Sequence, residues 1–447
     1  MDVLTTILAF LVALGLLIVV HELGHFWVAR WCGVKVLRFS VGFGRPIARW
    51  VLGPDRTEWV IAAVPYGGYV RMLDEREAES GPIDPADLPR AFNRQSVPRR
   101  AAIVAAGPAA NLLFAILIYF GLNLYGMPDL RAVVAAPKAG TPAAVAGVVE
   151  GDVVERIDDQ TVRSWGDLRW SLLRQATEHA RSQLVVHGAD GTQRTLTMDL
   201  SSIDTDKIDN DWFARIGLIP GDAESVVEEV KPGDPGAQAG LQVGDRIVSI
   251  EGAQVRSAAD VRRHVRVAAN QRLQFGIERA GQTVQIAITP IEGFEGKEHF
   301  GRIGVGFGNT ILVRYPPLEA AQHAVGRTWE TCWFTLRMLG QMVTGHASLK
   351  NLSGPVKIAS VAGQAARIGP LAFLTFLALV SISLGVLNLL PVPVLDGGHL
   401  LYYVIEVVTG SPPSQASIEL GQRVGIGLLV VLTALALYND LTGLLFQ

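Results

Sequence analysis

Two histidines and one glutamate form the cluster with the clearest chemistry in the sequence. Residues 21–25 read His-Glu-Leu-Gly-His, and in a helix the side chains of His21 and His25 share one face because they are four residues apart. Two neutral imidazoles on one face can bind a zinc ion, and Glu22 is close enough to reach a water on that ion. The spacing therefore predicts a metal site with an adjacent base.

The alternative interpretation is a pair of solvated histidines beside a surface glutamate. The residues before the motif argue against it, because positions 3–20 carry no charge and are apolar enough to lie in a membrane. Ionisable groups at membrane depth are costly and by default functional. We therefore expect the motif to bind metal.

Asp396 is the strongest candidate for a third metal ligand. A catalytic zinc commonly has three protein ligands, and two histidines with a carboxylate are one known set. Asp396 is the only acidic residue between Arg367 and Glu406, and it follows a long apolar segment. His399 is the competing ligand; its other interpretations are a residue that supports the ligands or a core histidine.

A helix break precedes Asp396. Pro391 and Pro393 have no amide donor, so they interrupt a helix, and backbone freed at membrane depth must be buried in protein or face a wet cavity. Asn388 lies just before this break. It either holds substrate backbone or the oxyanion, or it satisfies the broken helix.

The composition indicates a membrane protein. Only 18% of the 447 residues are charged, where soluble domains average about 25%. With 39 Lys plus Arg against 42 Asp plus Glu, no basic surface for nucleic acid is expected. Cys32 and Cys332 are the only cysteines, which excludes a disulfide scaffold. Four apolar segments can cross a bilayer: residues 3–20, 101–128, 368–395 and 424–439.

The charge distribution predicts the topology. The first apolar segment has no basic residue before it and no small-x-small site after it, so we interpret it as a retained helix. Residues 30–100 hold 12 Lys or Arg and 8 Asp or Glu, which favours the cytoplasm. The N-terminus and the polar block of residues 129–367 are then expected on the outer face.

That polar block contains an internal repeat. Residues 146–157 match residues 239–250 at an offset of 93, including the steps Gly151-Asp152 and Gly244-Asp245. Two copies of a module of roughly 90 residues indicate tandem globular domains, because a solenoid needs at least three repeats. The modules resemble PDZ domains, which bind peptides by adding a strand to a sheet edge. The alternative is a pair of β-rich spacers without a ligand.

The chain resembles the site-2 protease family of intramembrane zinc metalloproteases over nearly its whole length. The resemblance rests on HELGH at the end of a first span, on NLLPVPVLDG at the end of a third, and on the modules between them. Shorter matching pieces are Gly42-Phe43-Gly44, residues 66–72, Gly107-Pro108 with Asn111, and residues 351–355.

The resemblance implies zinc as the cofactor, bound by His21, His25 and Asp396, with Glu22 as the general base. It also implies a bacterial inner-membrane protein with periplasmic PDZ modules. The expected partners are membrane lipid and single-span membrane proteins, such as an anti-sigma factor of envelope stress signalling and signal-peptide remnants. Peptide ligands of the PDZ modules are a further expectation.

The loop after the first span is expected to present substrate. Residues 38–45 and 59–71 are β-like runs separated by a Gly-Pro-Asp turn, and the family likeness suggests a hairpin that dips into the membrane. A free strand edge can hold an unwound substrate in extended form. Gly42, Phe43 and Gly44 are candidate substrate-binding residues, together with Asn388, Pro391 and Pro393. The alternative for the two glycines is a simple turn.

We therefore predict an α-helical membrane protein with four transmembrane helices and a membrane-associated β-hairpin, plus two tandem β-rich PDZ domains. The predicted parts are residues 1–127 (first membrane domain), 128–220 and 221–310 (PDZ domains), 311–367 (amphipathic interfacial helices) and 368–447 (second membrane domain). The predicted activity is hydrolysis of peptide bonds in transmembrane segments of single-span proteins.

Two other function classes share part of this pattern. A catalytically inactive metal-binding scaffold would keep the PDZ modules and lose turnover, and the intact Glu22 argues against it. A transporter would also use broken helices at the bilayer midplane, but the sequence has no inverted repeat and does have the HExxH motif.

Overall fold

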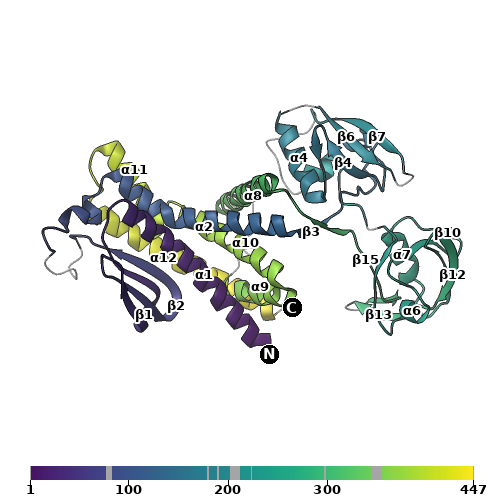
Figure 1. Cartoon of the computed structure of the whole chain (residues 1–447), viewed down its shortest axis with the longest axis horizontal. Coiled ribbons are helices and arrows are strands. Elements are labelled where there is room, and N and C mark those ends of the chain that lie inside the picture. The colour runs from purple at the N-terminus through teal and green to yellow at the C-terminus, as the bar shows by residue number, and fades with distance from the viewer. Residues whose placement is uncertain are drawn as a thin grey trace. The chain divides into compact units, whose positions relative to one another are not determined.

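The chain folds as two compact units (Figure 1). The computed structural model describes residues 2–76, 83–178, 181–188, 191–201, 212–222, 224–295, 298–344 and 354–445. Unit 1 comprises residues 1–125 and 314–447, and unit 2 comprises residues 126–313. Residues 351–353, part of one matching sequence piece, lie outside the described residues.

Unit 1 is mainly helical. Its elements are α1 (Asp2–Trp31), β1 (Val36–Leu52), β2 (Thr57–Met72), the 3-10 turns η2 (Leu88–Arg90) and η3 (Phe92–Arg94), α2 (Val97–Tyr125), α8 (Pro317–Val343), α9 (Pro355–Ile368), α10 (Pro370–Asn388), α11 (Asp396–Thr409) and α12 (Gln415–Leu445). Among the described helices, α1, α2, α10 and α12 are long and apolar enough to cross a membrane, as predicted.

All four helices differ in their bounds from the predicted segments, and the structure explains the differences at α10 and α12. Helix α10 ends at Asn388 instead of continuing to residue 395, because the prolines that follow cannot extend a helix. Helix α12 begins at Gln415, nine residues before the predicted segment. The prediction missed its first turns because they are polar and carry Glu419 and Arg423. Hydropathy alone marks the apolar part of a helix and misses such polar turns.

Helices α1 and α2 approach each other very closely. A Cβ atom on Gly24 of α1 would lie 2.3 Å from the carbonyl oxygen of Ala106 in α2, so only glycine fits at this crossing. Further along α1, Ala13 and Leu17 pack with Phe376 of α10 in a buried core. The close crossing places the backbone of α2 directly beside the HExxH turn.

The two long strands β1 and β2 form a sheet against the C-terminal half of α1. Phe39 of β1 is paired with both halves of β2, through Trp59 on one side and Val70 on the other. The rings of Phe26, Phe39 and Trp59 form a buried cluster with centroid distances of 4.6 to 5.8 Å. This cluster fixes the sheet next to the motif on α1.

Helices α8 and α9 are tied to the spans by polar contacts. Asn123 of α2 donates a hydrogen bond to the carbonyl of Ala320 in α8 at 3.1 Å. Asp440 of α12 is buried and accepts hydrogen bonds from the amides of Gly354 and Lys357, at 2.9 and 3.0 Å, at the start of α9. Asp440 therefore caps α9 from another helix, which satisfies amides that would otherwise be unpaired.

Unit 2 contains two four-stranded sheets of the same topology. Their strand orders are β5-β4-β6-β7 and β10-β9-β11-β12. Its elements are β3 (Met127–Leu130), α3 (Pro142–Ala146), β4 (Val153–Ile157), β5 (Gln160–Thr161), α4 (Trp165–Glu178), β6 (Arg181–His187), β7 (Gln193–Asp199), α5 (Trp212–Ile216), β8 (Val227–Val230), α6 (Pro235–Gln238), β9 (Arg246–Ile250), β10 (Ala253–Gln254), α7 (Ala258–Arg266), β11 (Leu273–Arg279), β12 (Gln282–Ile288), β13 (Ile291–Glu295), β14 (Glu298–Arg302), β15 (Val305–Phe307) and β16 (Thr310–Val313).

The sequence repeat corresponds to a structural repeat. Each sheet has its own buried apolar core, one around Trp212 and the other around Phe275. Each of the repeated aspartates pairs with an arginine, but from a different strand of its sheet: Asp152 pairs with Arg194 of β7, and Asp245 pairs with Arg279 of β11. The first and last strands of the unit, β3 and β16, pair with each other. The chain therefore enters and leaves unit 2 through one strand pair.

Candidate metal centre

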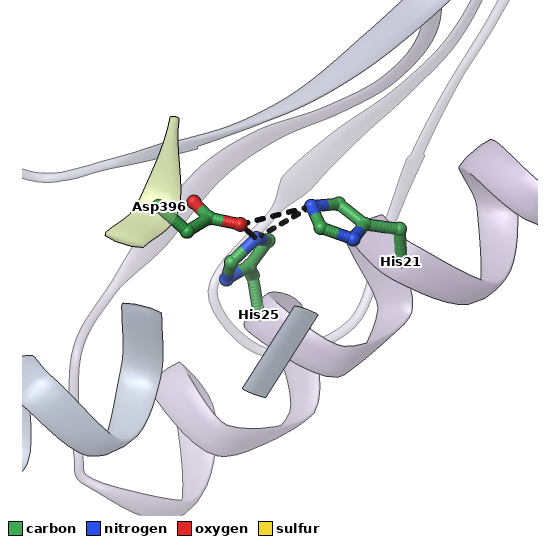
Figure 2. A group of neighbouring side chains, drawn as sticks. All are labelled: His21, His25 and Asp396. Atoms are coloured by element: carbon green, nitrogen blue, oxygen red, sulfur yellow. Dashed lines mark hydrogen bonds and ion pairs between the residues drawn. The ribbon is translucent and has the colours of Figure 1, made fainter. Parts of the chain in front are cut away.

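Three side chains from α1 and α11 converge on one point (Figure 2). The Oδ2 atom of Asp396 lies 3.2 Å from Nε2 of His21 and 3.5 Å from Nε2 of His25. The two Nε2 atoms are 3.2 Å apart. Within the described residues, this is the only group of three or more His, Cys, Asp or Glu side chains close enough to hold a metal ion.

These distances fit a zinc ion. Ligands at 2.0 to 2.1 Å on the corners of a tetrahedron lie about 3.3 Å apart, which is the observed spacing of the three donor atoms. The Asp396 Oδ2 atom is buried and lacks a well-oriented hydrogen-bond partner. A buried carboxylate oxygen facing two imidazole nitrogens is satisfied by a shared cation.

The local fold of α1 and α2 gives the imidazoles room. His21 and His25 lie on one helical face with ring centroids 4.8 Å apart and planes at 82°. On the neighbouring helix, a Cβ atom at Gly107 would lie 2.2 Å from Nε2 of His25 and 2.8 Å from Cε1 of His21. Glycine at position 107 therefore keeps the space in front of both rings open.

Helix α2 also contacts the second nitrogen of each imidazole. Nδ1 of His25 lies 2.8 Å from the carbonyl oxygen of Ile103, and Nδ1 of His21 lies 3.1 Å from the side-chain nitrogen of the fully buried Asn111. The Oδ1 atom of Asn111 has no hydrogen-bond partner. Exchanging the amide's two ends would let Oδ1 accept a hydrogen bond from the Nδ1–H of His21, leaving Nε2 free to bind metal.

Sequence reasoning missed these supporting contacts. Asn111 stood out only as part of a short matching piece, and a polar residue in an otherwise uncharged span was the available signal. The carbonyl of Ile103 has no sequence signal, because every residue carries a carbonyl group.

Glu22 lies next to the ligands and under the sheet. Its side chain is buried, with 8% of its surface exposed, and a Cβ atom on Gly68 of β2 would lie 2.9 Å from its Cγ atom. Strand β2 thus covers the residue that the sequence predicts to be the base. A covered carboxylate beside the donor group is suited to handle one proton without competition from bulk water.

A tight turn connects α10 to Asp396. The amide of Val392 donates to the carbonyl of Leu390 at 2.7 Å, and the amide of Leu395 donates to the carbonyl of Val392 at 3.0 Å. Val394 has a φ of 111°, a strained conformation for a β-branched residue. A Cβ atom at Gly397 would lie 2.1 Å from the carbonyl oxygen of Leu390, so the turn is packed tightly onto the start of α11.

The other predicted residues lie outside the ligand group. Asn388 is the last residue of α10, and Pro391 and Pro393 belong to the turn that leads to Asp396. His399, the competing ligand, is not part of the group and instead stacks edge-on against Tyr402 at 6.2 Å. The sequence alternative of His399 as a ligand is therefore not supported by the geometry.

Gly42, Phe43 and Gly44 lie within strand β1 and do not belong to the turn between α10 and α11. Both glycines have positive φ values, 94° and 88°. A Cβ atom on Gly42 would lie 2.9 Å from the carbonyl oxygen of Val64 in β2. Phe43 is 44% exposed, and its ring is stacked on Tyr69 at 6.0 Å. These residues bend β1 and leave one aromatic ring accessible beside the sheet.

Comparison with known proteins identifies the family. The profile of Peptidase family M50 matches residues 9–432, which is nearly the whole chain. The chain belongs to Peptidase family M50. This is the site-2 protease family, so the identification made from the HELGH and LDG motifs is confirmed.

Relatives of the chain match it from end to end. A Ralstonia nicotianae protein named as a zinc metalloprotease is 43% identical, over 98% of this chain and 98% of its own length. The regulator of sigma-E protease RseP of Escherichia coli is 39% identical over 98% of both chains. The protease RseP of Yersinia pestis is 39% identical over 99% of this chain and all of its own. The predicted metalloprotease class is confirmed, against the inactive scaffold.

One solved structure similar to part of the chain is a PDZ domain of an SdrC-like protein from Listeria innocua. It is 17% identical, and the match covers 21% of this chain and 97% of that one with a TM-score of 0.17. A TM-score this low carries no conclusion about the fold of unit 2.

Proposed function

We propose that this M50 peptidase is an intramembrane zinc protease that hydrolyses peptide bonds in the membrane segments of single-span proteins. The observation that carries the proposal is the convergence of His21, His25 and Asp396 at tetrahedral spacing, on helices apolar enough to lie in a bilayer. We assign zinc to these three residues and general acid–base chemistry to Glu22.

The reaction is the addition of one water molecule across a peptide bond. Zinc held by His21, His25 and Asp396 would polarise the peptide carbonyl and lower the pKa of the attacking water toward about 7. Glu22 accepts a proton from the attacking water as the new carbon–oxygen bond forms. Glu22 then gives that proton to the leaving nitrogen as the carbon–nitrogen bond breaks, so the carboxylate is regenerated.

The sheet of β1 and β2 is the proposed substrate platform. A peptide in helical form keeps its amides bonded to its own carbonyls, so it must unwind before water can attack, and an extended peptide can pair with a strand edge. We assign substrate contacts to Gly42, Phe43 and Gly44 on β1. We assign Asn388, Pro391 and Pro393, at the end of α10 and in the turn before α11, to contacts on the side of the substrate that faces away from β1.

The relatives' names as regulators of sigma-E support an anti-sigma factor as a substrate, and the family resemblance in the sequence suggests signal-peptide remnants as a second class. We propose an anti-sigma factor with one membrane span and remnants of signal peptides as substrate classes. We place the protein in a bacterial inner membrane with unit 2 on the periplasmic side, because the basic segment of residues 30–100 favours the cytoplasm.

Unit 2 is proposed to be a pair of PDZ modules, at residues 128–220 and 221–310. Supporting observations are the sequence repeat and the two sheets of identical strand order. We propose that these modules exclude substrates with large folded outer domains and admit shortened ones.

The deciding experiment measures metal and cleavage together. The purified protein in phospholipid vesicles should contain one zinc ion per chain and cut a single-span substrate within its apolar segment, as located by mass spectrometry. Asp396→Asn should lose both zinc and cleavage. A wild-type protein without stoichiometric zinc, or an Asp396→Asn protein that still cleaves, would exclude the proposed site.

A further inference from the structure

Helix α11 begins with the proposed metal ligand Asp396, and it contacts the rest of unit 1 through a charged side chain while its apolar side is exposed. The helix packs along α2, and its one charged side chain beyond the first turn, Glu406, faces α2. The opposite face is apolar and exposed, with exposed fractions of 59% at Val404, 68% at Val407 and 79% at Val408. The helix is therefore charged toward the protein and apolar toward its surroundings, as suits a helix embedded in lipid.

One ion pair holds the far end of α11 to α2. Nη2 of Arg100 donates to Oε1 of Glu406 at 2.7 Å. Both side chains are mostly buried, with 12% and 16% exposed. The guanidinium of Arg100 also lies over the ring of Tyr403 at 5.0 Å from its centroid. Two contacts on neighbouring residues of α11 therefore converge on one arginine.

The arginine is held in place from its own side as well. Nε of Arg100 donates to the backbone carbonyl of Gln95 at 3.1 Å. The Gln95 side chain in turn donates to the carbonyl of Pro89 at 2.9 Å. The guanidinium is thus oriented by the segment before α2, so its contact with Glu406 has a defined direction.

Arg100 completes a pattern along α2. The helix supplies no ligand, yet its Ile103 carbonyl contacts His25 and its Asn111 side chain contacts His21. Arg100, one turn before Ile103, contacts the helix that carries Asp396. Residues of α2 therefore contact both histidines and the helix that carries Asp396.

We propose that the Arg100–Glu406 ion pair is a positioning device for the metal ligand Asp396. A helix behaves as a rod, and Glu406 lies ten residues from Asp396, about 15 Å along the axis. Fixing that end against α2 prevents α11 from rocking, and so keeps the carboxylate at the spacing that zinc needs from the two imidazoles. This inference rests on the zinc site proposed above.

The test measures how fast zinc leaves the folded protein. Wild type and Glu406→Gln are loaded with zinc in phospholipid vesicles, and release to a chelating dye is followed well below the unfolding temperature. Glutamine keeps the shape and removes the charge. We expect zinc release to be about tenfold faster in Glu406→Gln, the lower range for losing a contact that supports a metal ligand.

A matched variant separates positioning from general stability. Glu75 pairs with Arg94 at 2.7 Å in the loop after β2, in the same unit, and its hydrogen bonds among the described residues go to Asn93 and Arg94 of η3. Glu75→Gln should release zinc at the wild-type rate. Equal acceleration in Glu75→Gln and Glu406→Gln would overturn the proposal, as would a Glu406→Gln protein that keeps zinc as wild type does.

Two further variants close the test. In a double-mutant cycle, Arg100→Gln combined with Glu406→Gln should release zinc no faster than the worse single variant, because the two residues act as one contact. If a single variant fails to fold, Arg100→Leu with Glu406→Leu removes both buried charges and should fold. That variant should still release zinc faster, and wild-type retention would overturn the proposal. A wild type that binds no zinc would overturn both the site and this inference.

Discussion

At the residue scale, Glu22 differs from the two histidines beside it in what it contacts. His21 and His25 face Asp396, whereas the Glu22 side chain lies against Gly68 of β2. Glu22 is not part of the group of possible metal ligands, which agrees with its proposed role as the base. Because the Glu22 side chain contacts β2 and the two histidines face Asp396 of α11, changing the proposed base need not disturb the proposed metal ligands.

Glu22→Gln should separate metal binding from catalysis. Glutamine has nearly the same shape but cannot accept the proton, so cleavage of a single-span substrate should fall by 10² to 10⁴-fold, the range for a general base. Zinc content, measured on the same sample by atomic absorption, should stay at one per chain. Substantial cleavage by a zinc-loaded variant would remove Glu22 from the role of base.

Much of the metal centre was predictable at this scale. The four-residue spacing of His21 and His25 has one geometric meaning in a helix, and Asp396 was the only acid near the proline break. The partners on α2 were not predictable, because a contact such as Arg100 with Glu406 spans 306 residues of sequence and exists only once the helices pack.

At the element scale, α12 supports the turn that holds Asp396. A Cβ atom on Gly425 would lie 1.9 Å from the carbonyl oxygen of Pro393, whereas a Cβ atom on Gly427 would meet nothing within 4 Å. The carbonyl belongs to the backbone next to the strained Val394. Helix α12 therefore packs on the turn at Gly425 and also at Gly421, where a Cβ atom would lie 3.4 Å from Cγ of Pro393. Moving α12 away from the turn would shift Asp396.

Gly425→Ala should impair the enzyme, and Gly427→Ala should not. The first variant forces α12 and the turn apart at a cost of about 1 to 3 kcal/mol, typical of overpacking. We expect cleavage to drop at least tenfold and zinc release to accelerate. The measurements are initial cleavage rates and zinc release, side by side for both variants. Equal behaviour of the two alanines would show that the contact has no role.

Each repeat of unit 2 contains a buried aspartate paired with an arginine, and this pair connects separate parts of the repeat. Asp245 is 1% exposed and accepts hydrogen bonds from Nε and Nη2 of Arg279, each at 2.6 Å. It also accepts a bond from the amide of Gln242 at 2.8 Å. Hydrogen bonds from Arg279 hold the pKa of Asp245 below its usual range. The pair therefore joins β11 to the turn before β9 through a carboxylate that must stay ionised.

Asp245→Asn should destabilise the second repeat by about 2 kcal/mol at pH 7, the scale of a charged hydrogen bond. Because the folded pKa is lowered, the wild-type advantage is fully present above the ordinary carboxyl pKa of about 3.9 and disappears as the pH falls through the lowered value. Hydrogen exchange of β11 amides in the intact protein measures this. Asp222→Asn, in the exposed pair with Arg262, should change protection little. An Asp245→Asn difference that persists unchanged into strong acid would contradict the assignment.

At the scale of the whole molecule, the chain order is informative about function. Unit 2 is inserted between α2 and α8, and both of its ends return through the paired strands β3 and β16. Unit 1 has its own core, formed by α1, α2, α9 and α10. We therefore expect unit 1 to stay compact when unit 2 is removed. The division into two units was predictable from the repeat and the hydropathy, whereas the pairing of β3 with β16 was not.

Removing unit 2 should therefore widen the range of substrates without removing the chemistry. We expect a variant lacking residues 129–309 to bind one zinc, to cleave shortened single-span substrates at a rate within about threefold of wild type, and to cleave full-length substrates that wild type refuses. The physical reason is the proposed size exclusion, in which the folded modules would compete for space with a large outer domain of the substrate. Rates on full-length and shortened substrates in vesicles measure this, with Asp396→Asn in the shortened chain as the inactive control. A zinc-loaded deletion protein that cleaves shortened substrates normally and still refuses full-length ones would rule out size exclusion. Recognition would then belong to the membrane unit itself, with strand addition at the β1–β2 sheet as the selective step.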